Sequence, residues 1–87
     1  PDSVENEILE LVANVPGVSD PHNLKTRRIG NHYAIELHIR MDGGITLNEA
    51  HDKASEVEQL LRRRYGEETH VAVHAEPEKE NSLRPNS

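Results

Sequence analysis

The chain has 87 residues, a formal net charge of −6 at pH 7, 33% hydrophobic residues, and no Cys, Phe or Trp. A chain of this length has room for one small domain with a thin aliphatic core, because short chains bury only part of the surface that they expose when unfolded. The acidic balance excludes nucleic acid and anionic membrane as partners, since both require clusters of unopposed Lys and Arg.

The absence of cysteine excludes a disulfide framework and thiolate metal ligands. No stretch approaches the ~20 apolar residues of a transmembrane helix, and none has the pattern of a signal peptide. The piece is therefore expected to be soluble. It begins with Pro1 rather than Met, so we expect a processed or excised fragment of a longer protein.

Apolar residues at helical spacing predict a first helix from about Ser3 to Asn14, which Pro16-Gly17 ends. The segment within 22–29 alternates weakly and carries many polar groups, so we predict an edge strand there. Gly30-Asn31 is a two-residue link in which Gly tolerates positive φ, and it predicts an antiparallel hairpin with the strand that follows.

The next strand has the clearest alternation in the chain. Its apolar residues are Tyr33, Ile35, Leu37, Ile39 and Met41, and its intervening residues are Ala34, Glu36, His38 and Arg40. This pattern predicts one buried face and one polar face.

A capping box from Thr46 to Glu49 predicts the start of a second helix, which runs to about Tyr65. Gly66 is expected to form a left-handed C-terminal cap. A last strand is predicted from Thr69 to Ala75 and is ended by Pro77. We expect a domain over residues 1–76 and a disordered tail over residues 77–87, which hold one large apolar residue.

The order helix, strand, strand, helix, strand predicts an α+β fold. The second helix joins the second and third strands as a crossover, which we expect to be right-handed. Both helices then cover one face of the sheet and leave the other face bare and polar. The predicted architecture is an open-faced two-layer sandwich related to the ferredoxin-like motifs.

Six histidines in so small a chain are its unusual feature. His38 lies on the polar face of the second strand, and His74 and Glu76 share the polar side of the last strand. His22 begins the first strand. Imidazole nitrogens and carboxylate oxygens are ligands of Zn²⁺, and three or four of them complete its shell. The placement predicts a metal site, although any one of these histidines taken singly is more often a solvated surface residue.

The other histidines are less clearly placed. His51 is on the second helix, which covers the opposite sheet face. It either packs half-buried with a backbone partner, reaches round a sheet edge, or binds metal from a second subunit. His32 and His70 are interpreted as surface residues, with His70 the better accessory ligand. The sequence contains no hydrolase, phosphate-binding or thiol-nucleophile motif, so we do not expect an enzyme.

Several segments, in register from about Val4 to Pro77, resemble the cytoplasmic domain of cation diffusion facilitators, which export divalent metal ions. The matching segments are Val15-Pro16-Gly17-Val18, His22-Asn23-Leu24-Lys25-Thr26-Arg27, Glu36-Leu37-His38-Ile39, Glu49-Ala50-His51 and Val73-His74-Ala75-Glu76-Pro77. The resemblance implies a metallochaperone-like fold, a homodimer beneath the transmembrane domain of a parent transporter, and a location on the cytoplasmic side of the membrane.

The resemblance also implies ligand roles. His22 and His38 would hold one ion, His51 and His74 a second, and Glu76 would bridge both, with some ligands crossing the dimer. Zinc-transporting bacterial members carry aspartate at the position of Glu76, and the extra methylene here moves the carboxylate. The implied metal is Zn²⁺ or another divalent cation such as Fe²⁺, Mn²⁺ or Cd²⁺.

The sequence thus predicts a metal-sensing, dimerising regulatory domain of an efflux transporter. The alternatives are a soluble metallochaperone or metal buffer, a dimerisation module that needs no metal, and, least favoured, a small metal-dependent hydrolase. Because ligating His must be neutral, metal affinity is expected to fall between pH 7.5 and 5.5.

Overall fold

The computed structural model describes residues 2–79, which form two helices and three strands in the predicted order. The elements are α1 (Asp2–Ala13), β1 (Ser19–Ile29), β2 (His32–Met41), α2 (Leu47–Tyr65) and β3 (His70–Pro77). The strands lie in one sheet in the order β1-β2-β3. β1 runs antiparallel to β2, and β3 runs parallel to β2 because α2 connects these two strands as a crossover. The predicted α+β fold is confirmed.

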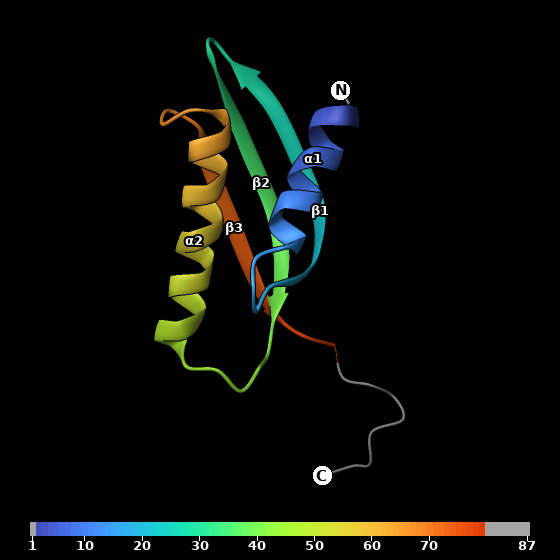
Figure 1. Ribbon diagram of the computed structural model, residues 1–87, viewed down its shortest axis with the longest axis vertical. Coiled ribbons are helices and arrows are strands. Elements are labelled where there is room, and N and C mark those ends of the chain that lie inside the picture. Colours follow the sequence, from blue (N-terminus) through green and yellow to red (C-terminus); the bar gives the residue numbers. More distant parts are fainter. Residues whose placement is uncertain (1, 80–87) are drawn as a thin grey trace.

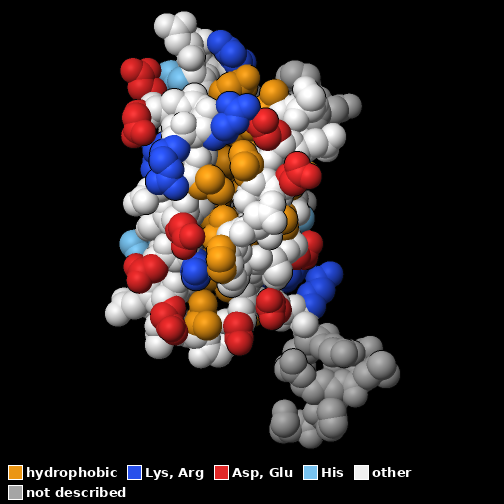
Figure 2. Space-filling model, in the orientation of Figure 1, with side chains coloured by type: hydrophobic (Ala, Val, Ile, Leu, Met, Phe, Trp, Pro, Cys, Tyr) orange, Lys and Arg blue, Asp and Glu red, His pale blue; other side chains and the backbone are white. Residues whose placement is uncertain are grey.

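Both helices pack on one face of the sheet, and β2 is its central strand (Figure 1). The core lies between them. It contains Ile35, Leu37, Ile39 and Met41 of β2, Ile8 and Val12 of α1, and Val57 and Leu61 of α2. Seen from the helix side, hydrophobic side chains gather in a band between the helices, with charged side chains around it (Figure 2). Because Ile35, Leu37, Ile39 and Met41 point into this core, the residues between them on β2 point to the uncovered face of the sheet.

Strand β1 begins at Ser19, three residues before the predicted start, and it is irregular. Asp20 and Asn23 have positive φ angles of 50° and 51°, and the pairing with β2 shifts register on both sides of His22. Such β-bulges bend a strand and redirect its side chains. Asp and Asn tolerate this backbone conformation better than most other residues. The irregular pairing on both sides of His22 sets the direction of its side chain.

The ends of α2 and β3 also refine the prediction. The Thr46–Glu49 capping box is present as predicted. Gly66 has φ 119° and ψ 148°, so it is not the left-handed helical cap that was expected, although its N–H still caps by donating to Arg62 O. β3 includes Pro77, which pairs with Met41 at the end of the sheet. The rest of the predicted tail, from residue 80 onward, lies outside the described residues.

Leu37→Ala should lower the free energy of unfolding by about 3 kcal/mol, because Leu37 is fully buried in the middle of the core and truncation leaves a cavity. Ile29→Ala is the matched control: this isoleucine at the end of β1 is 43% exposed, and its truncation should lower the free energy of unfolding by less than about 1 kcal/mol. Urea unfolding in the presence of a metal chelator measures the free energy of unfolding of both variants. Equal losses would contradict the proposed core.

Candidate metal centre

Three histidines form a row across the open face of the sheet, one from each strand. The backbone register places His38 opposite His22 on β1 and opposite His74 on β3. The ring centroids are 5.4 Å apart for His22 and His38 and 4.6 Å apart for His38 and His74. The sheet thus brings together three of the predicted ligands that are far apart in the sequence.

Glu76 joins two of these histidines. Its Oε2 lies 2.8 Å from His38 Nδ1, and its Oε1 lies 3.3 Å from His22 Nε2. The three side chains are partly buried, and they offer one ligand atom each, all within 4.8 Å of one another. Three such atoms could surround one ion, and Zn²⁺ binds nitrogen and oxygen at about 2.0–2.2 Å.

The orientation of His22 favours a cation at this point. Its Nδ1 lies 2.6 Å from the carbonyl oxygen of Asp20, and a carbonyl can only accept, so Nδ1 carries the proton. In the neutral ring Nε2 then presents a lone pair, and this lone pair faces the Glu76 carboxylate. Two electron-rich atoms 3.3 Å apart are stabilised by a cation between them, either a proton or a metal ion. A backbone carbonyl that fixes the tautomer is a common outer contact of metal-binding His.

A second group shares His38. Glu36 Oε2 lies 3.2 Å from His74 Nε2, and Glu36, His38 and His74 also offer ligand atoms within 4.8 Å of one another. Glu36 was not predicted as a ligand, although it has the same parity as His38 two residues later on β2. Parity alone did not reveal its pairing with His74, because that contact depends on the register between β2 and β3.

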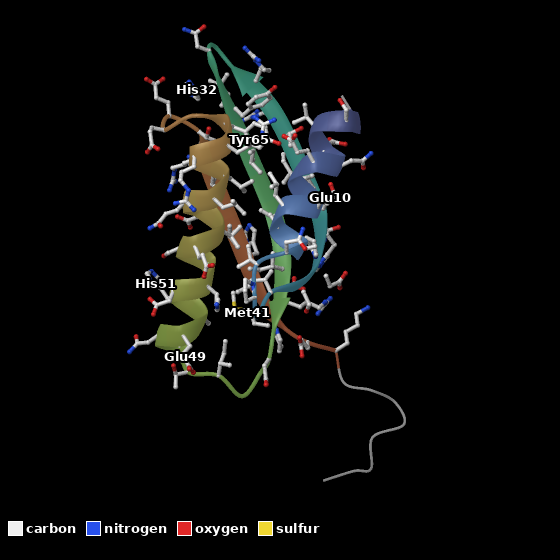
Figure 3. The ribbon with its side chains drawn as sticks, viewed as in Figure 1. Glu10, His32, Met41, Glu49, His51 and Tyr65 are labelled. Carbon is white, nitrogen blue, oxygen red and sulfur yellow. The ribbon has the colours of Figure 1, made fainter. Side chains whose placement is uncertain are left out.

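The remaining histidines lie elsewhere. His51 is exposed on α2 and points away from α1 (Figure 3), so the alternative of half-buried packing is wrong. Within the described residues it belongs to neither ligand group. His70 is exposed opposite Ala34 on the open face. His32 lies near the hairpin turn, with Nδ1 3.8 Å from Glu68 Oε1.

The charges around Glu76 stabilise its ionised form. The hydrogen bond with His38 lowers the pKa of this carboxyl most, burial opposes it as the next largest effect, and the charges of Arg40 and His22 lower the pKa by smaller amounts. Arg40 lies 3.3 Å from Glu76 Oε1. Glu76 is therefore a carboxylate at neutral pH, as a metal ligand must be.

Comparison with known proteins places the chain in a family. Residues 1–78 match the model described as "Cation efflux protein, cytoplasmic domain". The chain belongs to this family of efflux-protein domains. The family is defined by cation transport and not by an enzymatic reaction. None of the described helices is long and apolar enough to span a bilayer.

Two curated proteins similar to this chain are cation-efflux pumps named FieF. The pump of Escherichia coli is 39% identical over 77 residues, and that of Salmonella typhi is 38% identical over 77 residues. Each alignment covers 88% of this chain but only 25% and 26% of the pumps. The chain thus corresponds to about a quarter of the length of these relatives.

Solved structures share the fold. The metal-bound C-terminal domain of the CzcD transporter from Thermotoga maritima superposes with a TM-score of 0.77 at 28% identity, covering 86% of this chain and 87% of that one. The nickel form of a MamM CTD variant gives 0.80 at 25% identity, covering 91% and 100%. Both neighbours are named as domains with bound metal.

The lowered pKa of Glu76 predicts how acid affects stability without metal. Between the folded and the higher unfolded pKa, the unfolded chain binds more protons, so stability should fall as the pH drops through this range. In the presence of a metal chelator, the free energy of unfolding measured with urea should decline less steeply between pH 6 and pH 3 for Glu76→Gln than for the wild type. Each protein is compared with its own value at pH 7. An unchanged slope would show that the interactions of this carboxylate do not favour the folded state.

Proposed function

We propose that this domain is the metal-sensing, dimerising cytoplasmic part of a divalent-cation efflux transporter. The observation that carries the proposal is the row of three histidines on the open sheet face, with a carboxylate on either side of His38. The family relation supports it, since efflux pumps contain such domains.

The donor set favours a divalent ion of intermediate softness. Imidazole suits Zn²⁺ and several transition metals, while carboxylate also suits Mn²⁺ and Fe²⁺. We propose Zn²⁺ as the principal ion, with Fe²⁺, Mn²⁺ and Cd²⁺ as competitors. The first ion binds His22, His38 and Glu76, which already approach one another and whose ligand atoms need the least movement.

A second ion would use His74 and Glu36. A neutral imidazole offers a single lone pair, so His38 can serve only one of the two ions. The second ion therefore needs a donor from outside this chain. We propose His51 of a second copy, because His51 is exposed and lies on the helix that covers the opposite sheet face. Glu76 can bridge to this ion if its carboxylate turns toward His74.

The N-terminal turn of α2 offers a surface to that second copy. Leu47 is 86% exposed and lies one helical turn before His51, so both project from the same side of the helix. A hollow of about 390 Å³ adjoins this turn and reaches Glu76. Its apolar lining comes from Met41, Ile45, Leu47, Ala50, Ala75 and Pro77. An apolar surface beside the ligands suits an interface that includes them.

Charge explains how metal would control such a dimer. Two chains of net charge −6 repel each other, and each bound divalent ion offsets part of this repulsion while adding coordination bonds. Metal then selects the closed dimer over an open one. We propose that this closure transmits the cytosolic metal level to the transmembrane domain of the parent transporter.

Calorimetric zinc titration and analytical ultracentrifugation of the domain at pH 7.5 test the proposal. The wild type should bind saturably and sediment as a more compact dimer with zinc. His38→Ala with His74→Ala should lower affinity at least about 100-fold, because it removes ligands from both groups. His32→Ala with His70→Ala is the matched control, since it removes two histidines that lie outside the groups and should bind as the wild type does.

Other outcomes separate the alternatives. Saturable binding by a monomer that stays monomeric would favour a metal buffer or chaperone. An unchanged dimer with no binding would leave a dimerisation module whose histidines are surface residues, and would overturn the proposal.

A further inference from the structure

Arg40 holds a fixed positive charge beside the candidate metal ligands. It lies on β2 two residues after His38, and its side chain is only 18% exposed. Its Nε donates to Asp20 Oδ2 at 2.9 Å, and its NH1 donates to the carbonyl oxygen of Pro77 at 3.0 Å. Its NH2 lies 3.3 Å from Glu76 Oε1. The guanidinium of this β2 residue is therefore held by groups from both neighbouring strands, β1 and β3.

The contact with Glu76 is to the same oxygen that faces His22. Oε1 of this carboxylate lies 3.3 Å from both His22 Nε2 and Arg40 NH2. A metal ion bound by His22 and Glu76 would thus have the guanidinium as a near neighbour. Because an arginine cannot lose its proton in a protein, the positive charge remains whether the site is empty or filled.

Asp20 links the ligand and the cation. Its backbone carbonyl fixes the His22 tautomer, and its carboxylate anchors Arg40. Asp20 makes both contacts from the positive-φ conformation that it has in the first bulge of β1. Since Arg40 has this anchor and the Pro77 carbonyl, a change at Glu76 need not release it.

We infer that Arg40 sets the metal affinity of the His22–His38–Glu76 group by opposing the bound cation. In the empty site Arg40 offsets the carboxylates of Asp20 and Glu76, so the ligands are held together without metal. In the filled site it repels a divalent ion a few ångströms away, which raises the metal concentration needed for closure. This inference rests on the proposed function, since it concerns the affinity of that same site.

The opposite effect would arise if Arg40 served only to position Glu76. Its removal would then loosen a ligand and weaken binding. The two accounts predict changes of opposite sign, so the affinity of one variant separates them. They also differ in salt dependence, because repulsion between charges is screened by added salt whereas a geometric role is not.

The test is zinc titration by calorimetry of Arg40→Gln beside the wild type, at pH 7.5 and at low and high ionic strength. Gln removes the charge but keeps a donor near Glu76. The variant should bind zinc about tenfold more tightly at low salt, and the difference should shrink at high salt. Equal or weaker binding by a folded variant would overturn the inference.

Two controls isolate the charge at this position. Arg40→Lys keeps the charge and should stay within about threefold of the wild type. Lys53→Gln makes the same change in net charge on α2, where Lys53 pairs with Glu56, and should leave the affinity unchanged. A gain in Lys53→Gln equal to that of Arg40→Gln would show a general charge effect and contradict a local role of Arg40.

Asp20→Asn provides a second test that leaves Arg40 in place. Asn tolerates the positive φ of this residue and keeps the backbone carbonyl, but it removes the negative charge that compensates Arg40. Zinc affinity should fall several-fold, and a gain would overturn the inference even if Arg40→Gln failed to fold. Absence of zinc binding in the wild type would instead refute the proposed function itself.

Discussion

The pairing register between β2 and β3 is the constraint on which the rest of the structure depends. It sets His38 opposite His74 and Arg40 opposite Glu76. A slip of one residue would turn His74 and Glu76 toward the helices and the valines of β3 toward solvent, because side chains alternate along a strand. Burial of Leu37 and its neighbours under α1 and α2 therefore fixes the candidate metal site at the same time as the core.

The site is stabilised without metal by its own charges. Glu76 contacts His38, His22 and Arg40, and Asp20 holds both His22 and Arg40. Such a network keeps the candidate ligands close to one another. In the proposed metal site, an incoming ion would meet the permanent positive charge of Arg40, so its affinity would reflect a balance between coordination and repulsion.

The sequence predicted the regular parts of the fold and fewer details of the site. Alternation along β2 and the Thr46 capping box depend on local patterns, and both are confirmed. The early start of β1 was missed because its residues are polar and its bulges at Asp20 and Asn23 follow no period. Glu36 was missed because its contact with His74 depends on the register between strands. Whether His51 is a ligand stays a prediction, since it depends on a second chain.

The measurement that tests the central claim most directly is anomalous X-ray diffraction from crystals of the domain grown with zinc. The account predicts a peak on the open sheet face between His22, His38 and Glu76, at about 2.0–2.2 Å from each ligand atom. A peak elsewhere on the chain, or none in this group at saturating zinc, would contradict the assignment of these residues as the metal site.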